Sequence, residues 1–527
     1  MRRRPPALLL LAAAAAVGLV ALPLAYLVVR AAEGGRRAWD VLVSDTLLEL
    51  VVDTGVLVGA VTGTALAIGL PLAWLTTRTD LPWRGLWATA AALPLVIPSY
   101  VAALVFLAAF GPRGLLQRLL EGAFGVERVP EIYGLPGAWL ALTVATYPFV
   151  FLLAAAALRD VDPALEDAAR GLGHSPLSTF RRVTLPVVRP SLAAGALLVA
   201  LYTLADFGAV SLMQYDSLTR AVYLQYRALF DRTPAAVLAL VLVAITAVVL
   251  ALELRARGRG ALHRSGAGSP RPAALVPLGR WRLPALIFCG LVVGLALVVP
   301  LTVLAYWSAR AFTLSEPIAW SWRPAVNSVG VSAVAAVVAV AASLPVATLA
   351  VRYPSRLSRL LERASYAGNA LPGIVIALSL VFFAANYVTP LYQTLALLVF
   401  AYVVRFFPQG LAGSASALAR VNPRLEEAGR SLGRSSGTVF ARITAPLVAP
   451  GLLAGGALVF LSTMKELPAT LLLRPIGFET LATEIWRYTS VGSYSRAALP
   501  ALLLIAVSAP LVYVLRARTA ADAGTPG

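Results

Sequence analysis

The residues best able to do chemistry in this sequence are a few charged side chains at the ends of long apolar segments. Asp206, Lys465 and Glu466 each follow an apolar run of about 20 residues. Ionisable groups in such places are costly to bury and commonly line a transport path or a gate. Carboxylates are hard ligands that suit a hard cation, and Tyr202 and Tyr215 would add further oxygens. We predict that these five side chains lie on a translocation path.

The same residues also have a purely structural interpretation. Charged side chains near the end of a span can extend to the membrane surface, and Lys465 can neutralise the neighbouring Glu466. A tyrosine at a membrane edge is more often part of the aromatic belt than a ligand. The sequence leaves both interpretations open.

Other kinds of chemistry are excluded by residues that the sequence lacks. Cys289 is the single cysteine, and His174 and His263 are the only histidines, so a Cys/His zinc site is excluded. No constellation of catalytic groups stands in or beside an apolar segment. Lys465 is the single lysine and does not follow a glycine, so a phosphate-binding loop is absent. We predict no catalytic residue, no cofactor and no permanent metal, and an ATPase that drives this chain must be another protein.

The composition indicates that a lipid bilayer surrounds the elements that hold these residues. The chain has 527 residues, of which 59% are hydrophobic and 13% are charged, and its mean hydropathy is +0.81. A soluble protein of this length needs more charge to cover its surface. The net charge of +19 therefore marks cytoplasmic loops and membrane edges rather than a nucleic-acid partner.

Apolar runs long enough to cross a hydrocarbon core of ~30 Å predict about twelve transmembrane helices. The first run follows Met-Arg-Arg-Arg and is longer than the apolar part of a signal peptide, so it is a retained helix. The predicted spans cover about 7–29, 51–76, 86–110, 137–158, 191–212, 235–253, 283–307, 328–350, 366–386, 390–411, 451–473 and 497–515.

Arginine placement sets the predicted orientation. Residues 254–282 are rich in Arg, Gly, Ser and Pro, which is typical of a cytoplasmic linker. Residues 111–136 balance their arginines with acids, as an outer loop does. We predict a multi-pass protein of the bacterial cytoplasmic (inner) membrane with both termini in the cytoplasm.

The two halves of the chain are an internal duplication. At a constant offset of 260, half of the positions in 163–190 are identical to those in 423–450. Leu70-Pro71 matches Leu344-Pro345 at an offset of 274, and we pair Leu93-Pro94 with Leu371-Pro372. Six spans per half give both halves the same orientation, so both repeated loops face the cytoplasm.

The repeated loop is built to form two short helices. Asp162-Pro163 and Asn422-Pro423 supply an N-cap residue followed by a proline suited to the first helical position. Gly173 and Gly433 stand where a left-handed residue would end that helix. The sequence predicts a helix, a tight glycine turn and a second short helix on the inner surface.

With these residues in place, the sequence resembles the inner-membrane subunits of bacterial ABC importers. The signature of that family is an EAA loop: E-A-A, three residues, G, nine residues, then I-x-L-P. Both copies keep every spacing, with Asp167 for Glu, Gly429 for the second Ala, Val183 for Ile and Ala445 for Leu. The resemblance implies an all-α polytopic fold of two parallel six-helix repeats, of the type I importer kind.

The resemblance also implies what the loops do and with which partners. In that family the loop is a coupling helix that docks on an ATPase; the alternative is an inner loop without a partner. The implied partners are two copies of a cytoplasmic ABC ATPase, a periplasmic or lipid-anchored substrate-binding protein and membrane lipid. The implied coupling residues are Glu166, Asp167, Ala168, Ala169, Arg170 and Gly173 in the first loop, and Glu426, Glu427, Ala428, Arg430 and Gly433 in the second.

The substrate is indicated by a second resemblance. Residues 464–486 look like the second half of fused permeases of the ferric-iron type, and Asp206 matches Glu466 at the offset of 260. Related permeases move thiamine, polyamines or oxyanions, so these cargoes are the alternatives. A twelve-helix secondary transporter is a more remote one, because the loop TTRTDLPWRG lacks the charged signature of that class.

The predicted domain organisation follows from the repeat and the linker. Two ABC permease domains are separated by a cytoplasmic linker, and each follows a helical segment with an outer loop. The predicted ranges are 1–46 for the N-terminal helix and outer loop, 47–257 for the first domain, 258–282 for the linker, 283–319 for an extra helix and outer loop, 320–518 for the second domain and 519–527 for the tail.

Overall fold

A computed structural model describes residues 5–112, 114–125, 130–228, 233–258, 275–313, 321–366, 368 and 371–524. Every named element within these ranges is a helix. Ten described helices are long and apolar enough to cross a membrane, and Gly373–Tyr387 and Tyr494–Pro510 are shorter apolar helices. The predicted all-α polytopic fold is confirmed. Most of the predicted linker, with His263, lies outside the described residues, as do the outer-loop residues 113, 126–129 and 314–320.

The helices follow one another in the same order in the two halves. The first half contains α1 (Ala7–Glu33), α2 (Gly35–Leu42), α3 (Asp45–Arg78), α4 (Arg84–Ala92), the 3₁₀ turn η1 (Leu93–Val96), α5 (Ser99–Phe110), α6 (Leu115–Phe124), α7 (Leu135–Asp160), α8 (Pro163–Gly171), α9 (Pro176–Thr179), the π-helical turn η2 (Phe180–Thr184), α10 (Leu185–Ala205), α11 (Gly208–Leu212), α12 (Leu218–Ala228) and α13 (Thr233–Gly258). The second contains η3 (Gly279–Trp281), α14 (Arg282–Val293), η4 (Gly294–Val298), α15 (Val299–Thr313), α16 (Arg323–Arg352), α17 (Arg356–Ser365), α18 (Gly373–Tyr387), η6 (Thr389–Leu391), α19 (Leu395–Arg420), α20 (Pro423–Ser431), α21 (Ser436–Val439), η7 (Phe440–Thr444), α22 (Ala445–Met464), α23 (Pro468–Leu473), α24 (Leu481–Ser490) and α25 (Tyr494–Gly524).

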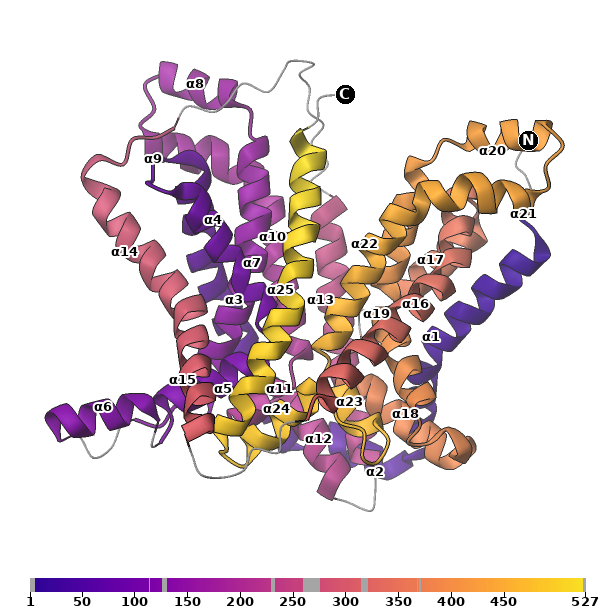
Figure 1. The fold of residues 1–527 in the computed structure, drawn as a ribbon, viewed down its shortest axis with the longest axis horizontal. Helices are drawn as coiled ribbons and strands as arrows, with labels where there is room; N and C mark the ends of the chain where they lie inside the picture. Colours follow the sequence, from indigo (N-terminus) through magenta and orange to yellow (C-terminus); the bar gives the residue numbers. More distant parts are fainter. Residues whose placement is uncertain are drawn as a thin grey trace.

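The two halves have the same orientation. Figure 1 shows the short helices α8 and α20 on one side of the molecule, at the top of the view, where α1 begins and α25 ends. Helices α11, α12, α23 and α24 lie towards the opposite side. The predicted parallel arrangement of two repeats is therefore confirmed.

Four of the predicted spans are interrupted rather than continuous. The span predicted at 86–110 is divided into α4 and α5. In the span predicted at 366–386 the α-helix α18 begins only at Gly373, after Pro372, and α17 ends before the span at Ser365. Prolines cause these breaks, because a proline has no backbone N–H and clashes with the preceding turn. The spans predicted at 191–212 and 451–473 end at Ala205 and Met464, and each is followed by a separate short helix.

The helix starts correct one pairing within the repeat. Pro98 is the N-cap of α5 and Pro372 is the N-cap of α18. These prolines differ by 274, the offset that also relates Leu70-Pro71 to Leu344-Pro345. The pairing of Leu93-Pro94 with Leu371-Pro372 is therefore wrong, because Pro98-Ser99 is the structural equivalent of Pro372-Gly373.

The leading helices of each half pack on the other half. Helix α1 contacts α16, α17 and α18, and the hydroxyl of Ser379 donates to the carbonyl of Pro23 at 2.6 Å. In turn α15 packs on α5 of the first half as well as on α25 of its own half, and α14 packs on α4. This exchange of leading helices between the halves holds the two halves together at places away from the centre of the molecule.

The end of the predicted linker is attached to the loop after α3. The N–H of Val276 donates to the carbonyl of Arg78 at 2.9 Å, and its carbonyl accepts from the N–H of Asp80 at 3.2 Å, which forms a parallel β-bridge between Val276 and Thr79. The Asp80 carboxylate accepts from the N–H of Leu278 at 2.8 Å and pairs with Arg282 at 2.9 Å. The hydrogen bond from the N–H of Leu278, and to a smaller extent the contact with Arg282, lower the pKa of Asp80 below its ordinary value.

Candidate functional site: coupling loops and central cavity

Each repeated loop forms the predicted helix–turn–helix. In the first loop the side chain of Asp162 accepts from the N–H of Ala164 at 3.0 Å, which caps α8. Gly173 has a φ of +85°, and its N–H and that of His174 bond back to carbonyls of the helix. Such a left-handed residue suits glycine and turns the chain sharply. The first loop therefore has the predicted cap and glycine turn.

The second loop has the same geometry. Asn422 accepts from the N–H of Arg424 at 3.0 Å, and Gly433 has a φ of +78°. Gly429 stands where the family signature has its second alanine. A Cβ there would lie 3.0 Å from both Ile443 and Val439, so the helix packs tightly against the following segment.

The residues predicted to couple the loops to an ATPase divide between two faces. Glu166 and Ala169 are buried, and Glu426 is mostly buried, so these three face the membrane domain. Arg170 and Arg430 are half-buried. The outer face presents Asp167, Ala168, Gly173, Glu427, Ala428 and Gly433, together with the apolar side chains of Leu172 and Leu432, which are each 82% exposed.

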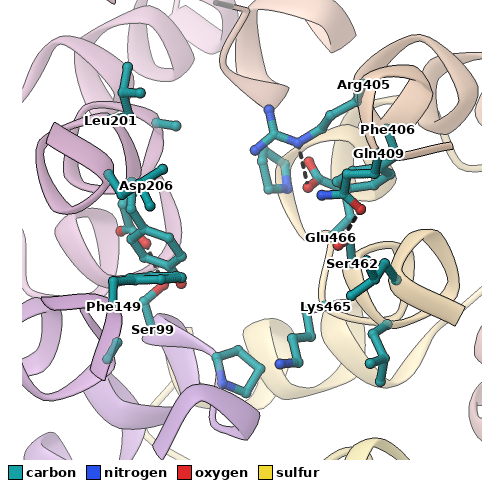
Figure 2. Close-up of a pocket in the computed structure, with 18 of the residues that line it drawn as sticks. Ser99, Phe149, Leu201, Asp206, Arg405, Phe406, Gln409, Ser462, Lys465 and Glu466 are labelled. Atoms are coloured by element: carbon teal, nitrogen blue, oxygen red, sulfur yellow. Dashed lines mark hydrogen bonds and ion pairs between the residues drawn. The ribbon is translucent and has the colours of Figure 1, made fainter. Parts of the chain in front are cut away.

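A central cavity of about 1250 Å³ lies between the halves. Asp206, Tyr202, Lys465 and Glu466 line it, so the structure brings four of the five predicted path residues together. Figure 2 shows Asp206 on one side of this space and Glu466 and Lys465 on the other. Tyr215 lies outside the lining, because its hydroxyl donates to the backbone carbonyl of Asp53 at 2.7 Å.

The two walls of the cavity are equivalent in position and different in chemistry. At the offset of 260, four apolar or aromatic lining residues of the first half correspond to polar or charged residues of the second. The asymmetry concentrates cations on the second wall. The pairs that differ in this way are Ala145 with Arg405, Phe149 with Gln409, Tyr202 with Ser462, and Ala205 with Lys465. Asp206 and Glu466 are both acidic, and other pairs, such as Leu198 with Leu458 and Leu201 with Leu461, are apolar on both walls.

Asp206 is held by the start of the next helix. It follows the last residue of α10, and its Oδ1 accepts from the N–H groups of Ala209 at 2.9 Å and Val210 at 3.3 Å. Its Oδ2 accepts from the hydroxyl of Ser99, the first residue of α5. The carboxylate thus joins α5, α10 and α11 at the wall of the cavity.

Glu466 is held by an arginine instead of a serine. The Nε of Arg405 lies 2.9 Å from the Oε2 of Glu466, and the Nη1 of Arg405 donates to the carbonyl of Leu371 at 3.1 Å. Gly373 makes this possible: a Cβ there would lie 2.2 Å from the Oε1 of Glu466 and 3.2 Å from the Cζ of Arg405. The first half has Ser99 at this place.

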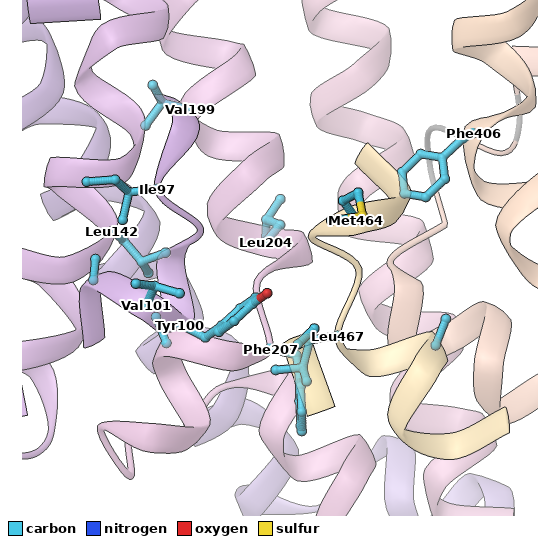
Figure 3. Packing of buried hydrophobic residues seen from close by; sticks show 14 of the residues in the cluster. Ile97, Tyr100, Val101, Leu142, Val199, Leu204, Phe207, Phe406, Met464 and Leu467 are labelled. Atoms are coloured by element: carbon cyan, nitrogen blue, oxygen red, sulfur yellow. The ribbon is translucent and has the colours of Figure 1, made fainter. Parts of the chain in front are cut away.

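Lys465 reaches across to the first half. Its Nζ donates to the backbone carbonyl of Leu95 at 2.8 Å. The alternative in which Lys465 neutralises Glu466 is not the arrangement found, since Arg405 pairs with that carboxylate. Apolar side chains of both halves also meet nearby, where Figure 3 shows Tyr100, Phe207 and Leu467 close together.

Comparison with known proteins places these features in a family. The model of the family described as "Binding-protein-dependent transport system inner membrane component" matches residues 54–255 and 339–520.

The chain belongs to this family. It is therefore a multi-pass inner-membrane permease subunit that works with an ABC ATPase and a substrate-binding protein, and it is itself a transport component and not an enzyme.

Individual relatives resemble this permease over different lengths. The Fe(3+)-transport system permease protein FbpB 2 of Haemophilus influenzae is 33% identical over 506 residues, which cover 95% of this chain and 96% of that protein. The ferric transport system permease protein FbpB of Actinobacillus pleuropneumoniae is 25% identical over 84% of this chain and 67% of its own. The molybdenum transport system permease protein ModB of Escherichia coli K12 is 34% identical over 28% of this chain and 62% of its own.

Sequence reasoning missed several residues of the permease cavity. Arg405 had a visible signal, because it interrupts the apolar run 395–404. Arg359 and Arg363 on α17 also line the cavity, although they lie between the spans predicted at 328–350 and 366–386. Ser99 and Gly373 carry no local signal, because their contacts come from segments more than 30 residues away along the chain. Among the described residues, no group of three or more His, Cys, Asp or Glu could hold a metal ion.

Proposed function

We propose that this permease imports ferric iron. The observation that carries the proposal is the resemblance to the Fe(3+)-transport permease of H. influenzae, which extends over 95% of this chain. Both carboxylates at the cavity wall come from the corresponding position of each half. In this proposal the iron passes between them, and ATP hydrolysis by the partner changes the side to which the cavity opens.

A second candidate cargo is an oxyanion. The match to the molybdenum permease ModB and the cations Arg405 and Lys465 on one cavity wall favour it. Thiamine and polyamines have no such support.

Transport by the purified complex tests the cargo. Permease, ATPase and binding protein are reconstituted in vesicles, and ATP-dependent uptake of radioactive ferric iron is measured with molybdate, sulfate or thiamine as competitors. We expect iron uptake that the competitors leave unchanged. Uptake of molybdate without uptake of iron would instead identify the oxyanion as the cargo.

We also propose how the partners are arranged. One copy of the ATPase docks on the outer face of each coupling loop, defined as 163–175 and 423–435, so two copies bind. Both termini are then cytoplasmic, because α1 begins and α25 ends on the side of these loops (Figure 1). The ranges 47–257 and 320–518 act as the two permease domains, with 1–46 and 283–319 as additional helical segments and 519–527 as a tail.

A further inference from the structure

The first coupling loop is tied to the membrane domain by a small buried network. The Nη1 of Arg78 lies 3.4 Å from the Oε2 of Glu166, and the hydroxyl of Thr184 donates to the Oε1 of Glu166 at 2.7 Å. The Nη2 of Arg78 also donates to the carbonyls of Leu158 at 2.5 Å and Val161 at 3.3 Å. We call Arg78, Glu166 and Thr184 the first brace.

The second half repeats the network with the same residue types. The Nη2 of Arg352 lies 3.0 Å from the Oε1 of Glu426 and donates to the carbonyl of Val421, also at 3.0 Å. The hydroxyl of Thr444 donates to the same Glu426 oxygen at 3.2 Å. We call Arg352, Glu426 and Thr444 the second brace. Two independent copies of one geometry argue against a chance contact.

Each brace joins a coupling helix to three spans. In the first half the arginine is the last residue of α3, the glutamate belongs to α8, and the carbonyls lie at the end of α7. The threonine ends the π-helical turn that runs into α10. A displacement of α8 therefore acts on α3, α7 and α10 through one guanidinium and one carboxylate.

The chemistry of the brace makes this link stiff. The side chains of Arg78 and Glu166 are 4% and 11% exposed, so little water competes for them. A planar guanidinium can bind several acceptors in fixed directions, which an ammonium cannot do. Removing one member leaves the other charge buried without its partner.

We propose that the two braces carry the movement of the coupling loops into the spans, and that Glu166 and Glu426 are positioning residues rather than contacts of the ATPase. The proposal rests on the docking of the ATPase at the two loops. It predicts that weakening the braces separates movement of the loops from movement of the cavity walls.

Two pairs of spin labels measure these movements separately. One pair, at Ser178 on α9 and Thr438 on α21, lies just outside the docking ranges and reports the approach of the loops. The other, at Leu198 and Leu458, reports the distance across the cavity. Labels are attached to introduced cysteines in permease–ATPase complexes with Cys289 replaced by serine. In the parent protein we expect ATP to change both distances.

The double variant Arg78→Lys/Arg352→Lys is the test. Lysine keeps the positive charge but lacks the planar guanidinium that binds several acceptors in fixed directions. We expect ATP to bring the loop labels together as in the parent, while the distance across the cavity stays at its ATP-free value. A normal change of both distances would overturn the proposal, because the braces would then be dispensable. A loss of both would also overturn it, because the arginines would then serve docking.

A second measurement compares transport with ATP hydrolysis. In reconstituted vesicles, uptake per ATP hydrolysed should fall by about tenfold in the double variant, within the range of typical coupling between sites. The matched control is Arg159→Lys/Arg356→Lys, two exposed arginines at helix ends outside both braces. A proportional fall of uptake and hydrolysis would show a merely structural role. If the parent complex transports a cargo other than iron, uptake of that cargo is measured instead, and the ratio of uptake to ATP hydrolysis still tests the braces.

Discussion

At the scale of single residues, the two cavity carboxylates are held in different ways because one backbone position differs. Ser99 donates a hydroxyl to Asp206, whereas Gly373 at the equivalent position leaves room for Arg405 beside Glu466. A neutral donor leaves the charge of Asp206 in place, and the guanidinium compensates that of Glu466. The duplicated positions therefore present different charge to a cargo.

The pair formed by Arg405 and Glu466 gives a prediction on stability. Arg405→Gln leaves a carboxylate that is 6% exposed without its partner, which we expect to cost about 3–5 kcal/mol. The double variant Arg405→Gln/Glu466→Gln removes both charges and should recover most of that loss. Thermal unfolding of the purified permease, arranged as a double-mutant cycle, measures the difference. If the loss of stability in the double variant equalled the sum of the losses in Arg405→Gln and Glu466→Gln alone, the pair would contribute no coupling.

Gly373 gives a prediction on space. In Gly373→Ala the new methyl group would meet Glu466 at 2.2 Å, so the ion pair must shift. We expect a lower melting temperature and impaired uptake. The matched control is Gly330→Ala on α16, where nothing lies within 4 Å of the added Cβ, and where alanine favours the helix by about 1 kcal/mol. If Gly373→Ala had the same melting temperature as the parent and as the control Gly330→Ala, the predicted clash with the ion pair would be refuted.

At the scale of elements, the sequence was most informative where local signals decide the structure. The caps Asp162 and Asn422 and the glycines of the coupling loops predicted both turns, because capping and positive φ are local properties. The breaks within the third span of each half were missed. Their apolar composition continues across the prolines, and a proline inside a span does not always interrupt it, since α3 contains Pro71 without ending there.

The glycine turns give the prediction for the coupling loops. Gly173→Arg/Gly433→Arg places side chains at φ values of +85° and +78°, which L-residues rarely adopt, and adds bulk to the docking face. We expect uptake to be abolished while membrane insertion is retained, as measured by transport in vesicles and by the amount of permease in the membrane fraction. Gly85→Arg, on an open face of α4, is the control and should transport normally. Full transport by the double variant would refute docking at these turns.

At the scale of the whole molecule, the repeat and the arginine-rich loops predicted two parallel halves with their coupling loops on one side. The composition of the cavity was only partly predictable. Asp206, Lys465 and Glu466 stand out as charges after apolar runs, but the charge balance of the cavity depends on Arg359, Arg363 and Arg405, which other helices bring to it. Tertiary packing, which no local pattern encodes, decides which charges face each other.

The cavity also predicts from which side the permease can be labelled. Its lining extends from Asp206 and Glu466 to Arg359 and Arg363 on α17, at the end of the molecule that carries α8 and α20 (Figure 1). Leu458→Cys, in a chain with Cys289→Ala, should react with a membrane-impermeant maleimide in inside-out vesicles and stay unreacted in right-side-out ones. The position is 47% exposed. Equal labelling in both preparations would contradict a cavity open to the cytoplasm in the resting state.

The exchange of leading helices has a consequence for biosynthesis. Helix α1 leaves the ribosome long before α16, α17 and α18, on which it packs and which are made some 300 residues later. The first half likewise receives α14 and α15 only after the linker has been translated. Neither half can therefore complete its packing while the other is missing. Each half expressed alone should be degraded. Co-expression of the two halves from a gene divided within the linker should restore both to stable amounts in the membrane fraction.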